Sequence, residues 1–397
     1  MKLTRTLSII CAAVAATATA APAEELRIGF LSTTTGSGAL IGTEMERGFK
    51  LGLEHQGWNK DGDKLSGVPT KVIYADDQAR AEVGVSHVTR FLEQEKVQVV
   101  SGVIWSHVMM AIMKPVMDAK AMLVSANAGP SPLAGALCNP LFVSASFVND
   151  QAAEATGMMV ERDKIKSVVA MAPNYQAGKD VIAGFERNYK SGKVAQQILF
   201  KLGESDYQAY ITEIRSLKPE AVFVFAPGAM GVSFVKQWVA SGINKDVKLY
   251  AMWTISHETL PAIGDAAIGA IMADYWNPDL DNPKNKKFIG DYMAKYKQHP
   301  SHFAMTAYDA AGVIGSGVKA TNGKLNDMAA VARAIRKGTF ESARGNLKFN
   351  VNGFPIQPFW KLDVVRGADG KPVIRGLDKI VEQPDSYAEK CPADKRL

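Results

Sequence analysis

Short β-rich runs alternate with longer amphipathic runs along this chain, in two successive series. The strand-like runs of the first series are LRIGFL (26–31), TKVIYA (70–75), VQVVSGV (97–103) and AMLVSA (121–126). Those of the second are SVVAMA (167–172), KVAQQILF (193–200), AVFVFA (221–226), VKLYAM (247–252) and GAIMADYW (269–276). Helix-like runs lie between them, near 43–56, 79–95, 106–119, 176–190, 207–217 and 229–241. Such alternation predicts parallel sheets covered by helices on both faces, and two series predict two such domains.

The N-terminus predicts a cleavable leader. Lys2 and Arg5 precede the apolar run LSIICAAVAATATA, and the small residues that follow fit cleavage after Ala20 or after Ala23. The apolar run is shorter than the roughly 20 residues that a membrane-spanning helix needs. We therefore expect a secretory signal peptide and export across a bacterial inner membrane to the periplasm. The remaining chain of about 375 residues exceeds what one hydrophobic core usually organises, which again favours two domains.

The region after the second series extends this organisation. A mostly helical stretch covers about 283–337, and the strand-like runs RGNLKFN and FPIQPFWKLDVV follow it. No low-complexity linker separates the two halves, so we expect short hinges that the chain could cross more than once.

Charge limits the possible partners, and the cysteine content allows one disulfide. The net charge of +6 falls to +4 when Lys2 and Arg5 leave with the leader, and no basic cluster is interleaved with aromatic residues. We therefore expect no nucleic-acid partner. Two cysteines, Cys138 and Cys391, remain after processing. In an oxidising compartment they could form a disulfide that ties the C-terminal tail to the first domain, or they could stay free thiols.

The residues just past each strand are the candidates for a binding site, because ligands of open parallel sheets bind outside the carboxyl ends of the strands. The first series places 32–38, 76–77, 104–107 and 127–129 there, and the second places 173–175, 227–229 and 253–254. These segments are rich in aromatic, small and hydrogen-bonding residues and poor in charge. They predict a pocket that holds a ligand rather than one that converts it.

Four of these residues have alternative roles. Ser106 could cap the following helix, or could hold an anion together with the free N–H groups of the helix end, and the two roles are compatible. Asn127 could serve only a turn. Tyr175 and Trp253 could be ordinary packing between domains, although we expect both to contact the ligand. His107 is expected to be structural.

The glycine-rich loop at 29–42 raises the alternative of an exported α/β enzyme. It contains Gly36-x-Gly38-x-x-x-Gly42, which resembles a phosphate-binding turn. In such turns a ribose-binding carboxylate follows about 20 residues later. Here the nearest acids at a strand end, Asp76 and Asp77, come far later, and we expect them to cap the helix after Gln78. A nucleotide site is therefore disfavoured.

Other catalytic and metal signatures are missing from the sequence. There is no Gly-x-Ser-x-Gly elbow, no Cys-x-x-Cys and no histidine spacing typical of metal ligands. His299 and His302 flank Pro300 and are expected at the surface. We predict no catalytic residues, no metal and no cofactor.

The order of several segments resembles a known family. IGFLSTTTGSGALIG, YADDQ, GVIWSHVMMA, SANAGPS, APNYQAGKD and FAPGAMGVSFVKQW, behind a signal peptide, resemble the periplasmic solute-binding proteins of branched-chain amino acid (leucine-type) ABC importers over nearly the whole mature chain. ANAGPS, APNYQAGKD and DLDNP are most similar to the branch that binds aromatic acids. The resemblance implies an α/β type I periplasmic binding protein fold, with two doubly wound parallel-sheet lobes joined by a three-segment hinge. The implied division is 1–23 signal peptide, 24–146 lobe 1, 147–277 lobe 2, 278–352 return to lobe 1, and 353–397 lobe 2 strand and C-terminal tail.

The resemblance also assigns roles to site residues. It implies that Ser106 and backbone groups of 127–129 hold a ligand carboxylate, and that Tyr175 closes from the other lobe. In the amino-acid binders an acidic residue after the strand that ends near Met252 holds the ligand ammonium. Trp253 takes that place here, and a buried ammonium without a carboxylate costs several kcal/mol.

We therefore expect a hydrophobic, aromatic carboxylate such as benzoate, hydroxybenzoate or cinnamate. If the alignment shifts so that Glu258 faces the ligand, a branched-chain or other amino acid is the alternative. The predicted ligand-binding residues are Ile41, Trp105, Ser106, Asn127, Ala128, Gly129, Tyr175, Pro227 and Trp253. The expected partners are this small carboxylate and an inner-membrane ABC permease, and the protein is expected to be a monomer.

Overall fold

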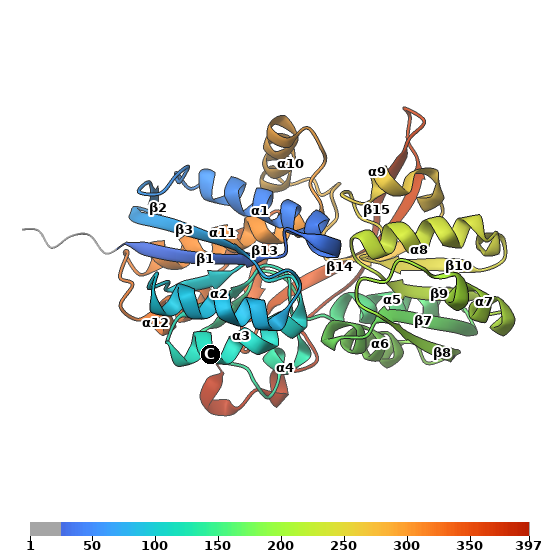
Figure 1. The fold of residues 1–397 in the computed structure, drawn as a ribbon, viewed down its shortest axis with the longest axis horizontal. Helices are drawn as coiled ribbons and strands as arrows, with labels where there is room; N and C mark the ends of the chain where they lie inside the picture. Colours follow the sequence, from blue (N-terminus) through green and yellow to red (C-terminus); the bar gives the residue numbers. More distant parts are fainter. Residues whose placement is uncertain (1–24, 397) are drawn as a thin grey trace, which may run out of the picture.

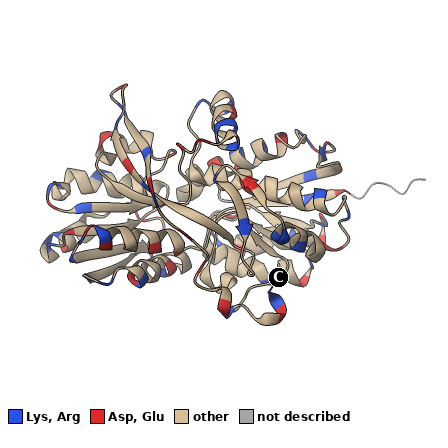
Figure 2. Cartoon of the chain, turned by 180° about the vertical axis from the view of Figure 1, so that it is seen from behind, with Lys and Arg blue, Asp and Glu red and all other residues tan. Residues whose placement is uncertain are grey.

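The computed structural model describes residues 25–396, which form two lobes side by side (Figure 1). The predicted signal peptide at 1–23 lies outside the described residues. Lysine, arginine, aspartate and glutamate are interspersed over both lobes (Figure 2). None of the helices within 25–396 combines the length and the apolar character that crossing a bilayer requires.

The first lobe is built on a sheet of six strands in the order β2-β3-β1-β4-β5-β6. Its strands are β1 (Leu26–Ser32), β2 (Lys64–Leu65), β3 (Val68–Asp76), β4 (Val99–Ser101), β5 (Met122–Ser125) and β6 (Phe142–Ser144). All neighbours from β3 to β6 are parallel, and β2 forms a short antiparallel pair with β3. The helices of this lobe are α1 (Ala39–Glu54), α2 (Ala81–Glu93), α3 (Ser106–Asp118), α4 (Ser131–Ala134), α10 (Pro283–Tyr296), α11 (His302–Ala320) and α12 (Met328–Lys337). Helix α1 packs on α11, so the return segment completes the first lobe.

The second lobe contains the parallel strands β8 (Lys193–Phe200), β7 (Ser167–Pro173), β9 (Ala221–Phe225), β10 (Lys248–Met252) and β11 (Ile271–Asp274), in that spatial order. Its helices are α5 (Gln151–Arg162), α6 (Gln176–Asn188), α7 (Gln208–Leu217), α8 (Ala229–Ala240) and α9 (Leu260–Ile263). Strand β9, AVFVF, is buried along its whole length, as expected of a central parallel strand covered on both faces.

The second sheet is mixed rather than purely parallel. Strand β14 (Pro355–Arg366) runs antiparallel to β11, and β15 (Pro372–Gln383) runs antiparallel to β14. The start of β14 also pairs with β13 (Gly345–Phe349), which pairs with β12 (Phe340–Ser342). The antiparallel direction of β15 relative to β14 follows from the hairpin at 367–371, because a turn this short can only join antiparallel strands.

Within residues 25–396, three stretches of chain cross between the lobes ahead of the C-terminal tail, which returns to the first lobe separately. The first joins β6 to α5, the second joins β11 to α10, and the third is the start of β14, which runs between the lobes in Figure 1. The buried Arg344 connects two of them, since its guanidinium donates to the carbonyls of Ala145 and Ser146 and to the side chain of Gln357 on β14. We propose the predicted limits at 146/147, 277/278 and 352/353 as the boundaries of the lobes.

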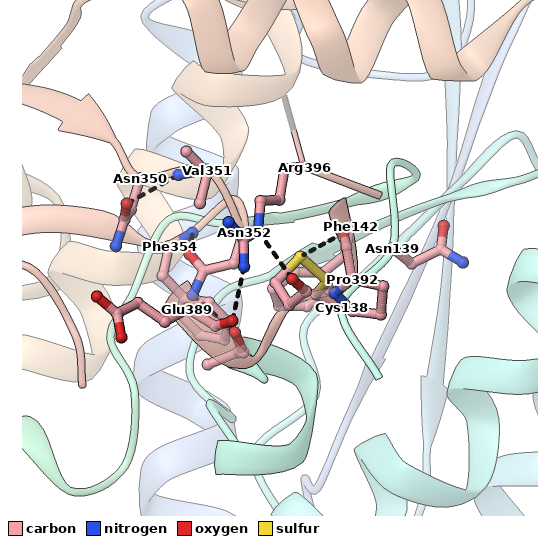
Figure 3. The surroundings of a disulfide bond; sticks show 12 residues. Cys138, Asn139, Phe142, Asn350, Val351, Asn352, Phe354, Glu389, Pro392 and Arg396 are labelled. Carbon is pink, nitrogen blue, oxygen red and sulfur yellow. Dashed lines mark hydrogen bonds between the residues drawn. A yellow bond between two sulfur atoms is a disulfide. The ribbon is translucent and has the colours of Figure 1, made fainter. Parts of the chain in front are cut away.

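The C-terminal tail returns from β15 to the first lobe. Cys391 in the tail and Cys138 form a disulfide with a Cα–Cα distance of 5.5 Å. Figure 3 shows it near Asn352 and Phe354, in the turn between β13 and β14. The Tyr387 hydroxyl donates to Asp150 Oδ2 at 2.6 Å, so the tail is also fixed to the first crossing.

Candidate ligand-binding site

A small cavity, partly open to solvent, lies between the lobes. Its walls from the first lobe and the crossings are Ile41, Ile104, Trp105, Ser106, Asn127, Phe147, Asn149 and Phe303. Its walls from the second lobe are Tyr175, Ala177, Phe225, Pro227 and Trp253. Most of these residues follow the carboxyl ends of parallel strands, which is where such folds place their ligands.

The lobes are closed on one another in this structure. Ser131 at the start of α4 donates to Asp180 on α6 twice, from its hydroxyl to Oδ1 at 2.7 Å and from its N–H to Oδ2 at 3.1 Å. Asn149 on the first crossing donates to the same Oδ2 at 2.9 Å. Asp180 therefore joins both lobes and the hinge beside the cavity.

The amino end of α3 provides free hydrogen-bond donors. The helix begins at Ser106 and its N-cap is Trp105, whose side chain makes no capping hydrogen bond. Ser106 is therefore the first helical residue and not the cap. Within residues 25–396, the backbone N–H groups of 106–108 have no acceptor. The positive end of the helix dipole and these N–H groups together favour an anion.

The hydroxyl of Ser106 adds a side-chain donor at the same place. It accepts a hydrogen bond from Asn149 Nδ2 at 3.0 Å, and its contact with Asn149 Oδ1 is only a marginal 3.5 Å. The hydroxyl proton can therefore turn toward a ligand. Asn127 Nδ2 donates to the carbonyl of Ile104 at 2.9 Å, while its Oδ1 is buried with no partner among the described residues.

Two of the predicted residues do not line the cavity. Ala128 donates its N–H to the carbonyl of Val103 at 3.1 Å, and Gly129 donates its N–H to Asn149 Oδ1 at 3.1 Å. Neither N–H is free for a ligand, so the expected role of the backbone at 128 and 129 does not fit this geometry. A Cβ on Gly129 would lie 1.8 Å from the carbonyl oxygen of Phe147, so this glycine allows close packing against the first crossing.

The other seven predicted residues, Ile41, Trp105, Ser106, Asn127, Tyr175, Pro227 and Trp253, all lie in the cavity wall. The wall also contains residues that the sequence did not single out as ligand-binding. These are Ile104, Phe147, Asn149, Ala177, Phe225 and Phe303. The signal available for Ile104 and Phe225 was their position at a strand end, whereas Phe303 lies on the return helix α11 and carried no such signal.

Aromatic rings make up much of the wall. Trp105 and Tyr175 face each other from opposite lobes in a T-shaped contact with ring centroids 5.9 Å apart. The ring centroid of Trp253 lies 4.3 Å from that of Phe147 and 5.9 Å from that of Phe225. Burial raises the pKa of the Tyr175 hydroxyl well above its ordinary value, so this hydroxyl stays neutral. The rings form a surface suited to a flat apolar group.

Trp253 holds an unusual backbone conformation. It directly follows β10 and has a φ of 46°, in the left-handed region that bulky residues rarely occupy. Its side chain is 4% exposed, and its indole Nε1 is buried without an acceptor among the described residues. Strain of this kind persists where the surrounding structure fixes it, often at a functional site.

Glu258, the alternative to Trp253, does not line the cavity. Its Oε1 accepts a hydrogen bond from the Ser256 hydroxyl, and its Oε2 is buried without a partner among the described residues, although part of the side chain reaches the surface. Burial raises the pKa of this carboxyl to about 7, against the opposing effect of the nearby His302. Trp253, and not Glu258, is therefore the one of these two residues that lies in the cavity wall.

The raised pKa of Glu258 predicts a pH-dependent stability. Since the ordinary value is 4.5 and the folded value about 7, the folded chain binds this proton more tightly than the unfolded chain. The stabilising contribution is present below about pH 4.5 and is lost as the pH rises through about 7. It amounts to at most about 3 kcal/mol. Glu258→Gln should therefore lose less stability than the wild type between pH 5 and pH 8, as measured by urea unfolding, with the exposed Glu93→Gln as control; equal losses would contradict it.

The glycine-rich loop serves packing and is fixed by the paired aspartates. A Cβ on Gly42 would lie 1.8 Å from the carbonyl oxygen of Thr33, so the loop lies directly against α1. The Thr33 hydroxyl donates to Asp77, and Asp76 accepts the N–H of Thr34 at 3.0 Å. Helix α2 begins only at Ala81, so the aspartates hold this loop and the turn before α2 and do not cap the helix.

His299 and His302 were expected at the surface, and for His302 this prediction was wrong. His302 is 4% exposed, and its Nδ1 lies 2.8 Å from Asp274 Oδ2. His299 is partly buried and stacks on His257 at 3.9 Å. Within residues 25–396, no three side chains of histidine, cysteine, aspartate or glutamate are grouped so as to hold a metal ion.

Comparison with known proteins places this fold and cavity in a family. The sequence profile described as periplasmic binding protein matches residues 25–371. Leu/Ile/Val-binding protein homolog 6 of Brucella melitensis is 25% identical over 378 residues, covering 93% of this chain and 95% of that protein. The leucine-, isoleucine-, valine-, threonine-, and alanine-binding protein of Pseudomonas aeruginosa is 24% identical, covering 83% of this chain and 87% of that protein.

Solved structures show the same two-lobe arrangement. An ABC transporter solute-binding protein from R. palustris, in complex with benzoate, superposes with a TM-score of 0.86 at 28% identity, covering 93% of this chain and 99% of that chain. A leucine binding protein from Thermotoga maritima superposes with a TM-score of 0.78 at 19% identity, covering 89% and 98%. The chain therefore belongs to the periplasmic binding protein family, as a solute-binding protein of the leucine-type ABC transporter class.

Proposed function

We propose that this protein captures a hydrophobic, aromatic carboxylate between its closing lobes in the periplasm and delivers it, as a monomer, to an inner-membrane ABC permease. Benzoate, hydroxybenzoates and cinnamate represent the class of ligand. The observation that carries the proposal is the composition of the cavity wall. Among its described residues there is no acidic side chain, and the indole of Trp253 is part of the wall. The resemblance aligns Trp253 with the acidic residue that holds the ammonium in amino-acid binders.

The physical balance favours an aromatic acid over an amino acid. Burying an aromatic ring of about 150 Å² contributes about 3 to 4 kcal/mol, and contact with the surrounding rings adds about 1 kcal/mol. The ligand carboxylate would receive charge-assisted hydrogen bonds from the Ser106 hydroxyl and the amino end of α3. The ammonium of an amino acid would be desolvated without a counter-charge, at a cost of several kcal/mol.

The benzoate complex from R. palustris supports the same ligand class, since that protein is 28% identical to this chain along nearly its whole length. Curated relatives with names that refer to leucine, isoleucine and valine keep the amino-acid alternative as the competing hypothesis.

Closure of the lobes explains how binding becomes transport. In an open form each lobe presents one wall of the cavity, and a ligand that contacts both walls shifts the population toward the closed form. Contacts between the lobes, such as Ser131 with Asp180, then form around it. A permease that recognises the closed form would accept the loaded protein, and no covalent step is needed.

A ligand screen tests the proposal. Benzoate-type acids should raise the melting temperature of the mature protein and be recovered chemically unchanged, while leucine and isoleucine should have little effect. A large shift with leucine and none with aromatic acids would establish the amino-acid alternative. Conversion of the added acid would establish an enzyme instead. Uptake that persists after deletion of the gene would indicate a sensory role rather than delivery.

Ser106→Ala should weaken benzoate binding about 10- to 100-fold, the effect of one hydrogen bond to a charged group. The unfolding midpoint of the free protein should fall only slightly, because the Asn149 amide that donates to this hydroxyl also donates to Asp180 and keeps that bond. Isothermal titration calorimetry measures the change. Ser316→Ala on α11 is the matched control, since its hydroxyl donates to the carbonyl of Val313 in its own helix and it does not line the cavity. Equal affinities of the Ser106 and Ser316 variants would exclude the carboxylate position proposed here.

A further inference from the structure

The side chain of Asn149, on the first crossing between the lobes, is hydrogen-bonded at both of its polar atoms. Its Nδ2 donates to the Ser106 hydroxyl at 3.0 Å and to Asp180 Oδ2 at 2.9 Å. Its Oδ1 accepts the N–H of Gly129 at 3.1 Å. Because a backbone N–H can only donate and a carboxylate can only accept, these partners fix the orientation of the amide. Asn149 is 2% exposed and lies in the cavity wall, but both of its N–H protons are already used.

The hydrogen bonds of Asn149 join the two lobes. Ser106 begins α3 of the first lobe, whereas Asp180 lies on α6 of the second. Asp180 is 6% exposed, and it also accepts from the N–H and the hydroxyl of Ser131 on α4 of the first lobe. An opening movement that separates α4 from α6 breaks the bonds between Asp180 and Ser131. The network around Asn149 is therefore complete only while the lobes are closed.

The Ser106 hydroxyl connects this network to the cavity. Its oxygen accepts from the Asn149 amide, so its own proton remains for an acceptor in the cavity, whose wall includes Ser106. A hydroxyl without such a partner rotates freely, whereas one that accepts from a fixed amide has its donor direction restricted. The amide is in turn held by Asp180 from the other lobe. Closure therefore orients the hydroxyl donor of the carboxylate site.

We propose that Asn149 is a positioning residue that couples recognition of the ligand carboxylate to closure of the lobes. Asp180 holds the Asn149 amide in the closed form, and the amide orients the Ser106 hydroxyl toward the carboxylate. Because hydrogen bonds in a chain polarise one another, a carboxylate at Ser106 strengthens the bonds behind it and shifts the population toward the closed form. The inference rests on the proposed function only in requiring a carboxylate at Ser106, whatever group that carboxylate is attached to.

A double-mutant cycle with benzoate and the full mature chain tests the coupling. Asn149→Leu, which keeps the branched shape of the side chain without its polar atoms, should weaken benzoate binding about 10-fold or more in calorimetric titrations. In a chain that already carries Ser106→Ala, the same substitution should weaken binding less than about 3-fold, because the hydroxyl that Asn149 orients is gone. Equal effects in the two backgrounds would show that Asn149 supports the fold and does not act through Ser106.

Asp180→Asn tests the role of the second lobe with an isosteric side chain, in which one acceptor oxygen becomes a donor. Stopped-flow fluorescence of the tryptophans in the cavity wall should show benzoate dissociating about 10-fold faster or more, with an association rate changed less than about 3-fold. The reason is that the ligand enters the open form, in which Asp180 does not hold Asn149. Glu186→Gln on the same helix is the matched control, because Glu186 accepts from Gln197 within the second lobe and does not line the cavity. Dissociation from the Asp180 variant as slow as from the Glu186 variant would overturn the inference.

The failures of the two proposals are distinguishable. If benzoate binds and the cycle is additive, the inference is wrong while the proposed function stands. If leucine binds and benzoate does not, the proposed ligand class is wrong, and the same variants decide the inference with leucine, which also carries a carboxylate. If Asn149→Leu does not fold, Asp180→Asn takes its place in the cycle, where its effect should again be smaller beside Ser106→Ala. If neither acid binds, both proposals fail.

Discussion

Arg344→Met should lower the free energy of unfolding by about 4 kcal/mol, the usual scale for removing one partner of a buried ion pair. The side chains of Arg344 and Asp309 are both fully buried, and Nη2 lies 3.0 Å from Asp309 Oδ2. Methionine fills part of the space but leaves the carboxylate of Asp309 buried without its counter-charge. The carbonyls of Ala145 and Ser146 would lose donors as well.

The position of Arg344 extends the effect of its loss to the crossings between the lobes. Its guanidinium joins the first crossing between the lobes to Gln357 on β14, which is the third crossing, and to α11 of the first lobe. Loosening it should free the hinge, so we also expect faster hydrogen exchange in the crossings. Guanidinium unfolding measures the stability change, and mass-resolved exchange measures the local one.

Two variants separate this explanation from a general loss of charge. Arg366→Met removes an exposed partner of Asp265 and should change stability by about 0.5 kcal/mol or less. Arg344→Met combined with Asp309→Leu should recover part of the stability, because no buried charge is then left unpaired. A loss of less than 1 kcal/mol in Arg344→Met would show that the buried pair does not stabilise the hinge.

The sequence predicted the central strands well because parallel strands buried on both faces are nearly continuous apolar runs. AVFVF at 221–225 is such a run, and it is strand β9. The sequence did not predict α5, QAAEATGMMVER, a helix that is buried on nearly every side, its charged and polar residues Gln151, Glu154 and Thr156 included. Its Glu154 is buried through pairing with Arg187, a partner 33 residues away. Such pairing is invisible to local periodicity.

Strand β15 was missed for a different reason. Its burial follows no regular alternation, and most of its residues are partly or fully exposed, because only β14 pairs with it. In the sequence, an edge strand without a regular apolar–polar alternation cannot be distinguished from irregular chain. The antiparallel direction of β14 and β15 depends on the hairpin between them, which local apolar periodicity does not specify.

The candidate site was predictable where topology alone positions a residue. Trp105, Tyr175 and Trp253 each follow a parallel strand, so the rule for strand ends placed them at the cavity. Phe147 lies on a crossing and Phe303 on a helix that returns after a long excursion, so their positions depend on how the lobes pack.

Burial of His302 could not be read from the sequence either. Pro300 beside it suggested a surface turn, but Asp274, 28 residues earlier, provides the charge that lets the imidazole be buried. The sequence shows which groups can ionise, but only the tertiary structure shows which of them are in contact. The hydrogen bonds of Asn149 with Ser106 and Asp180 became visible only in three dimensions for the same reason.

Removing the disulfide should have the largest effect on stability. Cys138 and Cys391 are separated by 253 positions, and closing a loop of that size restricts the unfolded chain by about 5 kcal/mol in the chain-entropy estimate. The double variant Cys138→Ala with Cys391→Ala should therefore unfold at a much lower denaturant concentration. Binding of benzoate should be kept, because neither cysteine lines the cavity.

The remaining anchors of the tail decide whether this loss is global or local. Without the disulfide the tail is still held by Tyr387 with Asp150, at 2.6 Å, and by Asn352 with Asp385, at 2.9 Å. These hydrogen bonds break when the chain unfolds, whereas the disulfide persists and restricts the unfolded ensemble. Reductant should therefore destabilise the wild type to the level of the double variant and leave the double variant unchanged. If the wild type keeps its unfolding midpoint after complete reduction, confirmed by a count of two free thiols, the disulfide does not stabilise this fold.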